Sequence, residues 1–477
     1  MNFRMIKYIL GWMLLFEACF MLLPAVCALI YRETAVIYFL ITMAICAVIG
    51  GLLLIRKPKN KTLYSRDGIV IVSMSWILLS AFGALPFFIS GEIPSFIDAL
   101  FESASGFTTT GASIVPNVEL LPKSMLLWRS FTHWVGGMGV LVFIMAFLPL
   151  SGAHNMHIMK AESPGPSVSK LVPRVRTTAM ILYSIYVALT LIQFILLIIA
   201  KMSVFDALNT AFATAGTGGF GIRSDSMASY SSAIQIIVTV FMLIFSVNFN
   251  SYYLILRGKF KDSFSTEVKC FIGIVVAFIA LITLNTVSMY NNTGDAIKHS
   301  SFTVASIIST TGFGTVDFNL WPSFSKTLLV LLMFLGGCAG STCGGIKLSR
   351  IIILFKTMLR ELRRNVHPKK VENISIDSHS VENSIVRSTA SYLICFCLIF
   401  IISILLISLD GKDLITNFTA VATTLNNVGP GLEAVGPTQN FAHFSDFSKI
   451  VFIFDMLAGR LELFPILLLF SPTTWKQ

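Results

Sequence analysis

Four short glycine-bearing stretches hold the residues of this sequence that are best suited to chemistry. They read FTTTGAS at 107–113, TAGTGGFG at 214–221, TTGFG at 310–314 and TTLNNVGPG at 423–431. Each combines glycine, whose backbone takes conformations closed to other residues, with hydroxyl or amide side chains. Backbone carbonyls turned toward one point can replace the water around a cation. The four stretches therefore predict a cation site built from backbone oxygens.

The rest of the chain is composed like a membrane protein. Of its 477 residues 55% are hydrophobic and 12% are charged, about half the charged share of soluble domains. Ten apolar runs have the roughly 20 residues that cross a bilayer, and we expect the first to be retained rather than cleaved. This predicts an all-α polytopic protein without a separate soluble domain. The runs are 8–31, 35–55, 68–90, 125–149, 178–200, 231–256, 270–289, 327–355, 386–409 and 447–470.

The net charge of +11 follows the membrane topology rather than pointing to nucleic acid. Basic residues concentrate in four alternate loops, at 56–66, 170–176, 257–261 and 347–370. Under the positive-inside rule these loops and both termini are cytoplasmic, and the glycine-rich stretches lie on the opposite side. The eight cysteines fall in or beside apolar segments with no CxxC pair, which favours packing over a transition-metal site or a disulfide framework.

The glycine-rich stretches repeat one supersecondary unit. When Gly111, Gly219, Gly312 and Gly429 are aligned, each follows a segment too short to span a bilayer. Each unit then reads as a spanning helix, a short re-entrant helix, a glycine-rich strand and a second spanning helix. An aspartate near the start of each short segment is expected to cap its helix; these are Asp98, Asp206, Asp295 and Asp413. The predicted units are a hairpin at 1–56 and repeats at 68–149, 178–256, 267–356 and 384–470.

Irregular backbone at membrane depth must be buried in protein or line water. Four re-entrant loops around a common axis would supply rings of carbonyl oxygens, and the threonines beside the glycines would add hydroxyl ligands. Short helices that point their partially negative C-terminal ends at that axis would favour a cation. The repeats therefore predict an ion-conducting pore.

Two further features lie below the predicted pore entrance. Residues 336–347, GGCAGSTCGGIK, place small residues in an apolar run, which predicts a helix break, although a tight helix–helix contact is the alternative. Arg460 lies deep in the last apolar run, where a charge is costly and usually functional. Either it projects into the pore, or it forms an ion pair with Asp455 or Glu462 that fixes helix packing.

Other charged residues in apolar segments are expected to have structural partners; these are Glu17, Glu102, Arg129 and His133. Glu433 and Asp317, just beyond the glycine loops, would either enrich cations at the outer mouth or be solvated loop residues. There is no HExxH metal motif and no Walker loop in the sequence. An intramembrane enzyme or a purely structural subunit therefore has little support.

The motifs together resemble the Trk/Ktr/HKT superfamily of potassium transporters, with the closest likeness to the membrane subunits of bacterial Trk uptake systems. SGFTTTGAS, ATAGTGGFG, STTGFG and NNVGPG carry the resemblance, with GGCAGSTCGGIK and DMLAGRLELFP, and it covers the whole chain. It implies four M1–pore–M2 units, like a potassium channel made from one chain, after an N-terminal hairpin. Glycine at all four filter positions is associated with passage of potassium and rubidium, whereas serine in the first loop accompanies sodium transport in the plant branch.

The resemblance also assigns residues. A selectivity filter for potassium falls on Thr109, Thr110, Gly111, Ala112, Thr217, Gly218, Gly219, Phe220, Thr310, Thr311, Gly312, Phe313, Asn427, Val428, Gly429 and Pro430. An intramembrane gate falls on Gly336, Gly337, Cys338, Ala339, Gly340, Ser341, Thr342, Cys343, Gly344, Gly345, Lys347 and Arg460.

The resemblance further implies a homodimer in the bacterial cytoplasmic membrane, with one pore per subunit. A cytoplasmic nucleotide-binding regulatory subunit of the TrkA type would control the gate, and the basic 347–370 segment is a plausible docking surface for it. Potassium is then the substrate, and no cofactor is expected in this chain. A sodium-coupled or sodium-permeable transporter of the same superfamily is the alternative.

Overall fold

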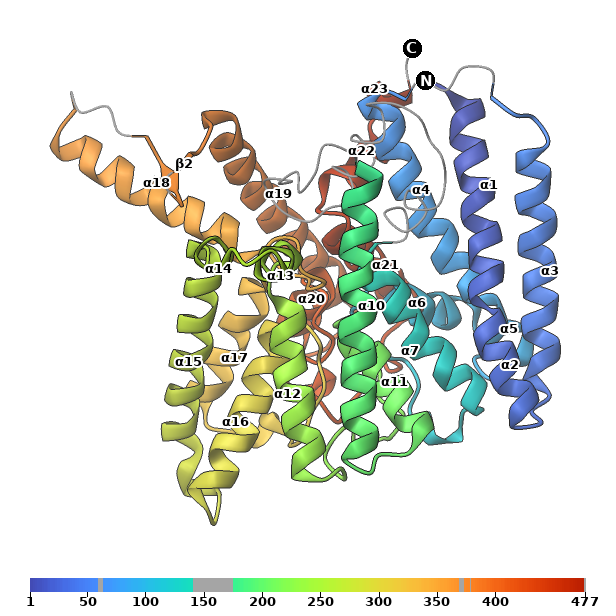
Figure 1. Ribbon diagram of the computed structural model, residues 1–477, viewed down its shortest axis with the longest axis horizontal. Helices are drawn as coiled ribbons and strands as arrows, with labels where there is room; N and C mark the ends of the chain where they lie inside the picture. Colours follow the sequence, from blue (N-terminus) through green and yellow to red (C-terminus); the bar gives the residue numbers. More distant parts are fainter. Residues whose placement is uncertain (59–62, 140–174, 369–372, 378, 476–477) are drawn as a thin grey trace.

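Apolar helices that run side by side form most of the structure, a computed structural model (Figure 1). It describes residues 1–58, 63–139, 175–368, 373–377 and 379–475. Both termini lie at the same end of the bundle (Figure 1). Within the described ranges six helical segments are long and apolar enough to cross a membrane; they are Phe3–Ile30, Ala35–Leu54, Ser65–Ser90, Thr177–Ile199, Thr266–Met289 and Asn383–Asp410.

The helices follow the predicted order. The hairpin consists of α1 (Phe3–Phe20), α2 (Leu22–Ile30) and α3 (Ala35–Leu54). The first helices of the four repeats are α4 (Ser65–Gly83) with α5 (Leu85–Ser90), α10 (Val175–Ile199), α15 (Thr266–Thr286) and α19 (Asn383–Ile407). The short helices are α6 (Phe96–Phe107), α11 (Val204–Ala215), α16 (Thr293–Ile308) and α20 (Leu414–Leu425).

The second helices are α7 (Lys123–Gly137), α12 (Ser232–Ser246) with α13 (Phe249–Leu256), α17 (Ser323–Leu335) with α18 (Leu348–Val366), and α21 (Asp446–Arg460) with α22 (Phe464–Phe470). Smaller elements are α14 (Phe260–Ser263), α23 (Pro472–Trp475) and the antiparallel strands β1 (Ser375–Ile376) and β2 (His379–Ser380). One-turn 3₁₀ helices cover Val118–Leu120, Val287–Met289, Phe318–Leu320, Ser408–Asp410 and Glu433–Val435.

The second helices are less regular than predicted. The break at 336–347 is confirmed, since α17 ends at Leu335 and α18 starts at Leu348. The sequence prediction was wrong in treating 231–256 and 447–470 as continuous, because α12 and α13 meet at 92° and a turn with positive φ at Glu462 and Leu463 separates α21 from α22. Most of the run 125–149 beyond α7 lies outside the described residues.

Serine, not aspartate, begins the short helices of the first two repeats. Ser95 accepts a hydrogen bond from the backbone N–H of Asp98, and Ser203 accepts one from that of Asp206. The predicted capping by these aspartates was therefore wrong, because each carboxylate lies three residues into its helix. Asp98 instead forms an ion pair with Lys449 of α21, which ties the first repeat to the fourth. The caps of α16 and α20 are Asn292 and the predicted Asp413.

The N-terminal hairpin supplies the cap of α7. Pro122 at the start of α7 provides no side-chain hydrogen bond. Glu33, in the turn between α2 and α3, accepts hydrogen bonds from the backbone N–H of Lys123 at 2.7 Å and of Ser124 at 3.1 Å, and from the Ser124 hydroxyl. A carboxylate at a helix N-terminus satisfies free amides and opposes the helix dipole. The hairpin thus fixes the outer end of the second helix of repeat 1.

We predict that Glu33→Ala lowers the free energy of unfolding by about 0.5–2 kcal/mol, the usual cost of losing an N-cap acceptor. Thermal unfolding of the detergent-solubilised protein measures this. The matched control is Glu92→Ala, since Glu92 lines the same outer cleft and no hydrogen bond of its carboxylate is seen in the described part of the chain. Equal losses in the two variants would contradict the capping role.

Candidate ion-conducting site

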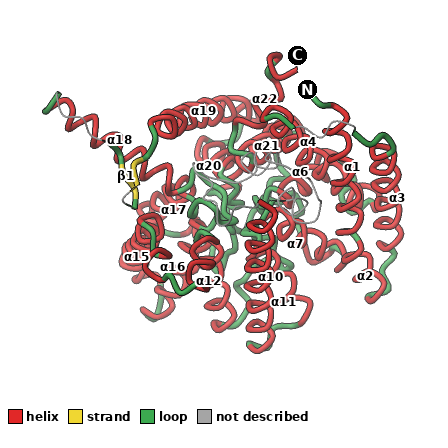
Figure 2. The backbone as a smooth tube through the Cα atoms, turned by 45° about the horizontal axis from the view of Figure 1, so that its top comes forward, coloured by secondary structure: helices red, strands yellow, loops and turns green. Residues whose placement is uncertain are grey.

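The four glycine-rich loops lie in the middle of the molecule, where loop segments are surrounded by helices (Figure 2). We name them glycine loops 1 to 4, at 108–112, 216–220, 309–313 and 426–430. Each follows the C-terminal end of a short helix, α6, α11, α16 or α20. Almost every residue of these loops is buried. The same element of each repeat therefore delivers irregular backbone to one central place.

The four loops share an unusual backbone conformation. The aligned glycine has a positive φ in each loop, from 75° at Gly219 to 100° at Gly429. The residue two positions before it also has a positive φ, of 53–57°, although it is a β-branched threonine in three loops. These residues are Thr109, Thr217, Thr310 and Asn427. A left-handed threonine costs about 1 kcal/mol or more. The alternating sign of φ turns successive carbonyl groups toward the same side of the chain.

The glycines bring the loops into a closed ring. A Cβ atom on Gly111 would overlap the carbonyl oxygen of Gly218, and one on Gly219 would overlap that of Thr311. A Cβ atom on Gly312 would likewise overlap the carbonyl oxygen of Val428, and one on Gly429 would overlap that of Thr110, which completes the ring. Four equivalent carbonyls thus lie at one level, each against the glycine of a neighbouring loop. Side chains are excluded there because the backbones approach too closely.

An outer hollow of about 170 Å³ opens above the ring. All four aligned glycines line it, together with Ala112, Phe220 and Pro430. Phe313 is instead buried in the apolar core beside α12 and α16. Among residues just beyond the loops, Glu433 pairs with Lys326 at 3.8 Å, and the carboxylate of Asp317 accepts from the N–H of Asn319. The ring is therefore reached from the side opposite the termini.

Arg460 lies on the inner side of the ring. Its guanidinium donates to the hydroxyl of Thr109 at 3.2 Å, to the carbonyl of Thr342 at 2.8 Å and to the carbonyls of Gly136 and Gly137 at the end of α7. The two carboxylates proposed as ion-pair partners have other contacts. Asp455 accepts from the Ser403 hydroxyl at 2.7 Å, and Glu462 pairs with Arg350. The Arg460 guanidinium thus connects glycine loop 1, the 336–347 segment and α7.

Residues 336–347 fold into a loop that fills the space below the ring. The N–H of Gly344 donates to the hydroxyl of Thr310 in glycine loop 3 at 2.8 Å. The carbonyl of Ser246 accepts from the N–H of Cys338 at 2.9 Å, and Gly340 accepts from Phe249 at 3.1 Å. The bend between α12 and α13 therefore exposes backbone groups that hold this loop. The described residues enclose a cavity of about 80 Å³ between the loop, Arg460 and the end of α7.

Two buried basic side chains, those of Lys347 and Arg350, lie at the inner end of this loop. Lys347, with a positive φ of 73°, donates from its ammonium to the carbonyl of Cys343. Arg350 forms a buried ion pair with Glu462, donates to the carbonyl of Ile346 at 3.2 Å and stacks over a tyrosine ring. Sequence reasoning missed Arg350, because it lies in a basic segment that is fully explained by topology. Glu462 reaches Arg350 because α21 ends at Arg460 and the chain turns before α22.

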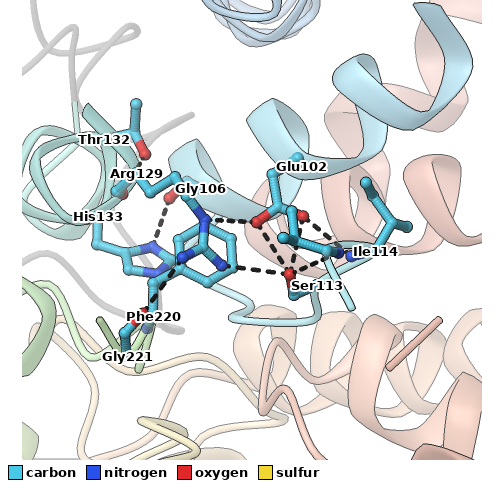
Figure 3. A network of polar contacts seen from close by, with 10 residues as sticks. Glu102, Gly106, Ser113, Ile114, Arg129, Thr132, His133, Phe220 and Gly221 are labelled. Atoms are coloured by element: carbon cyan, nitrogen blue, oxygen red, sulfur yellow. Dashed lines mark hydrogen bonds and ion pairs between the residues drawn. The ribbon is translucent and has the colours of Figure 1, made fainter. Parts of the chain in front are cut away.

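Glu102, Arg129 and His133 form a network behind glycine loops 1 and 2 (Figure 3). Arg129 donates to Glu102 at 2.7 Å and to the carbonyl of Gly221 at 3.2 Å. Glu102 also accepts from the N–H of Ile114 at 3.0 Å. Structural partners were predicted for these residues and are confirmed.

The corresponding prediction for Glu17 was wrong. Its carboxylate is buried against α4 and α6 without a hydrogen-bond partner among the described residues. All eight cysteines are free. The described parts of the chain contain no group of three metal-binding side chains.

Comparison with known proteins identifies this architecture. A family model described as "TrkH: Cation transport protein" matches residues 36–476. The chain belongs to the TrkH family. Proteins called "Trk system potassium uptake protein TrkH" from Escherichia coli and Salmonella typhimurium are each 38% identical to it, over the full length of both chains. The crystal structure of the potassium transporter TrkH from Vibrio parahaemolyticus matches with a TM-score of 0.90 and 36% identity, and covers 100% of both chains. These likenesses confirm the predicted resemblance and fold class.

The ring makes a direct prediction for its glycines. Gly219→Ala should lower the free energy of unfolding by more than about 2 kcal/mol, because a strained left-handed alanine would also overlap a carbonyl. The yield of monodisperse protein and its thermal unfolding in detergent report this loss. Gly51→Ala in α3 is the control, since open space surrounds that position, and it should change stability by no more than about 1 kcal/mol, in the favourable direction. A Gly219→Ala variant as stable as the control would contradict the ring.

Proposed function

We propose that this chain is the ion-translocating subunit of a potassium uptake system in the bacterial cytoplasmic membrane. The observation that carries the proposal is the closed ring of glycine loops, in which one carbonyl from each repeat lies against the glycine of the preceding repeat. Carbonyl oxygens at such close quarters can replace the hydration shell of a potassium ion. Relatives that share the full length of the chain are named potassium uptake proteins.

Selection of potassium takes place at the glycine loops, which act as a filter. An ion enters the outer hollow, loses water to the carbonyls of the ring and then meets the hydroxyls of Thr109, Thr217 and Thr310. The C-terminal ends of α6, α11, α16 and α20 point their partial negative charge at the ion. Glycine at all four aligned positions supports potassium and rubidium as substrates. Sodium permeation remains the alternative within the family.

The loop at 336–347 and Arg460 act as the gate. In this arrangement the loop is hydrogen-bonded directly to a filter threonine, and a fixed positive charge lies below the ring. Both raise the barrier to a cation, through lack of space and through repulsion. Movement of the loop away from Thr310 and Arg460 opens the path. The inside-negative potential then drives uptake, at about 2.3 kcal/mol per charge per 100 mV.

The cytoplasmic side carries the regulation. The positive-inside rule assigns both termini to that side, and α18, with its Arg363 and Arg364, extends away from the body of the protein (Figure 1). This helix continues directly from the gate loop, so a partner bound to it can move the gate. We propose a TrkA-like nucleotide-binding subunit as that partner, acting on a homodimer with one pore per subunit. Potassium is the substrate, and this chain needs no cofactor or catalytic residues.

Cation flux into proteoliposomes that hold this chain alone tests the proposal. With an imposed inside-negative potential, we expect uptake of potassium and rubidium well above that of sodium and lithium. Equal sodium uptake would retain the fold but reject the selectivity assigned to the four glycines. Absence of flux in the parent chain and in the open-gate variant described next would reject the pore.

Arg460→Ala is predicted to raise basal potassium flux by about tenfold or more, since each 1.36 kcal/mol removed from a barrier gives a factor of ten. Arg257→Ala is the control, because that arginine is exposed and stacks on Tyr253 far from the ring. Deletion of residues within 338–343 should raise flux further by removing the obstruction itself. Flux equal to that of the parent, from correctly folded Arg460→Ala protein, would argue against the barrier role.

A further inference from the structure

Glycine loop 2 lacks side chains that the other three loops use. In loops 1 and 3, hydroxyls one and three positions before the aligned glycine contact each other. Thr108 and Thr110 do so at 2.8 Å, and Ser309 and Thr311 at 2.7 Å. Loop 4 has Asn426 and Val428 at these positions, but loop 2 has Gly216 and Gly218. Nothing in loop 2 itself can therefore support the carbonyl that faces Gly111.

His133 of α7 occupies the space that loop 2 leaves empty. A Cβ atom on Gly218 would overlap the imidazole ring, and one on Gly216 would overlap the backbone carbonyl of His133. The imidazole also lies against the phenyl ring of Phe220, with ring centroids 4.2 Å apart. The guanidinium carbon of Arg129 lies over the same phenyl ring, 4.1 Å from its centroid. His133 is fully buried. It thus replaces from another repeat the side chain missing from loop 2.

Two hydrogen bonds fix the orientation of the imidazole (Figure 3). Nδ1 lies 2.7 Å from the carbonyl oxygen of Gly106, in the last turn of α6, so Nδ1 carries a proton and donates it. Nε2 lies 3.2 Å from the N–H of Phe220, so it accepts. A doubly protonated ring would place two donors against each other at Phe220. The neutral ring therefore links the end of α6 to glycine loop 2.

We propose that His133 is a specificity-determining positioning residue of the ion pathway, a role that rests on the proposed function. Its imidazole fills the space beside Gly218 that the threonine side chains of Thr110 and Thr311 fill in loops 1 and 3, and so keeps the Gly218 carbonyl at its place in the ring. One physical basis for selectivity between potassium and sodium is that a ring of carbonyls held at fixed size does not contract around the smaller ion. Removal of His133 leaves one quarter of the ring without lateral support and lets sodium pass.

The test is a pair of exchanges between His133 and Gly218. His133→Ala should lower the potassium-to-sodium flux ratio by about fivefold to tenfold. This range corresponds to the net free energy of one hydrogen bond. His133→Ala combined with Gly218→Thr gives loop 2 the residue of loops 1 and 3 and should recover most of the ratio. Gly218→Thr alone should impair the protein, because its side chain competes with the imidazole.

All variants are compared in the Arg460→Ala background, so that a closed gate does not mask the filter. His299→Ala is the matched control, since His299 is another helix histidine whose ring bonds to Thr315 near the outer surface. A second readout is the rise in melting temperature on exchange of sodium for potassium, which measures selective binding without flux. His133→Asn replaces His133→Ala in both readouts if the alanine variant does not fold.

The outcomes separate the two proposals. A parent chain that neither transports nor binds potassium in preference to sodium rejects the proposed function, and with it the role of His133. A selective parent whose ratio is unchanged by His133→Ala rejects only the positioning role, as does a lowered ratio that Gly218→Thr fails to raise. A loss of stability with an unchanged ratio assigns His133 to packing alone and likewise overturns the proposal.

Discussion

The structure depends on one constraint, which is that backbone polar groups inside an apolar bundle need partners. Four loops with left-handed threonine or asparagine residues stay in place only because their surroundings determine their conformation. Each strained residue costs about 1 kcal/mol or more. Close contact between glycines and carbonyls, together with the hydroxyl pairs behind loops 1 and 3, offsets that cost. The ring of oxygens is thus a product of backbone packing, and the side chains around it serve mainly to hold it.

The repeats are alike in the ring and unlike around it. Loops 1 and 3 are supported by their own hydroxyls, loop 2 by His133 and Arg129, and loop 4 by Asn427, which donates to Thr110 at 2.9 Å and to the carbonyl of Met456 at 3.0 Å. Among the described residues, the third repeat has the 336–347 loop between α17 and α18, and the fourth has Arg460 at the end of α21. Under the proposed function, divergence within a repeated unit therefore separates selection, which needs all four copies, from gating, which uses two.

Much of this arrangement could be predicted from the sequence. The glycine spacing predicted the four loops, and the apolar runs predicted the first helix of each repeat. The small residues at 336–347 predicted the break between α17 and α18. The turn at Glu462 could not be predicted, because an apolar helix continues through that pattern unless tertiary contacts interrupt it. The caps at Ser95 and Ser203 could have been predicted, because Ser-x-x-Asp before an apolar run places serine at the N-cap. The ring itself joins residues more than 300 positions apart, Thr110 and Gly429, which local patterns do not relate.

Opening of the inner path must obey the same constraint that forms the ring. Arg460 donates to the carbonyls of Gly136, Gly137 and Thr342, and the hydroxyl of Thr310 accepts from the N–H of Gly344. In the proposed opening, withdrawal of the 336–347 loop separates Thr342 from Arg460 and Gly344 from Thr310, and the cost of leaving each such group unsatisfied is about 1–3 kcal/mol. Water entering the cavity removes that cost, and the same water is needed to rehydrate the ion below the ring. In the proposed mechanism, gate opening and hydration of the inner cavity are therefore coupled, because incoming water supplies new partners for the backbone groups that the loop releases.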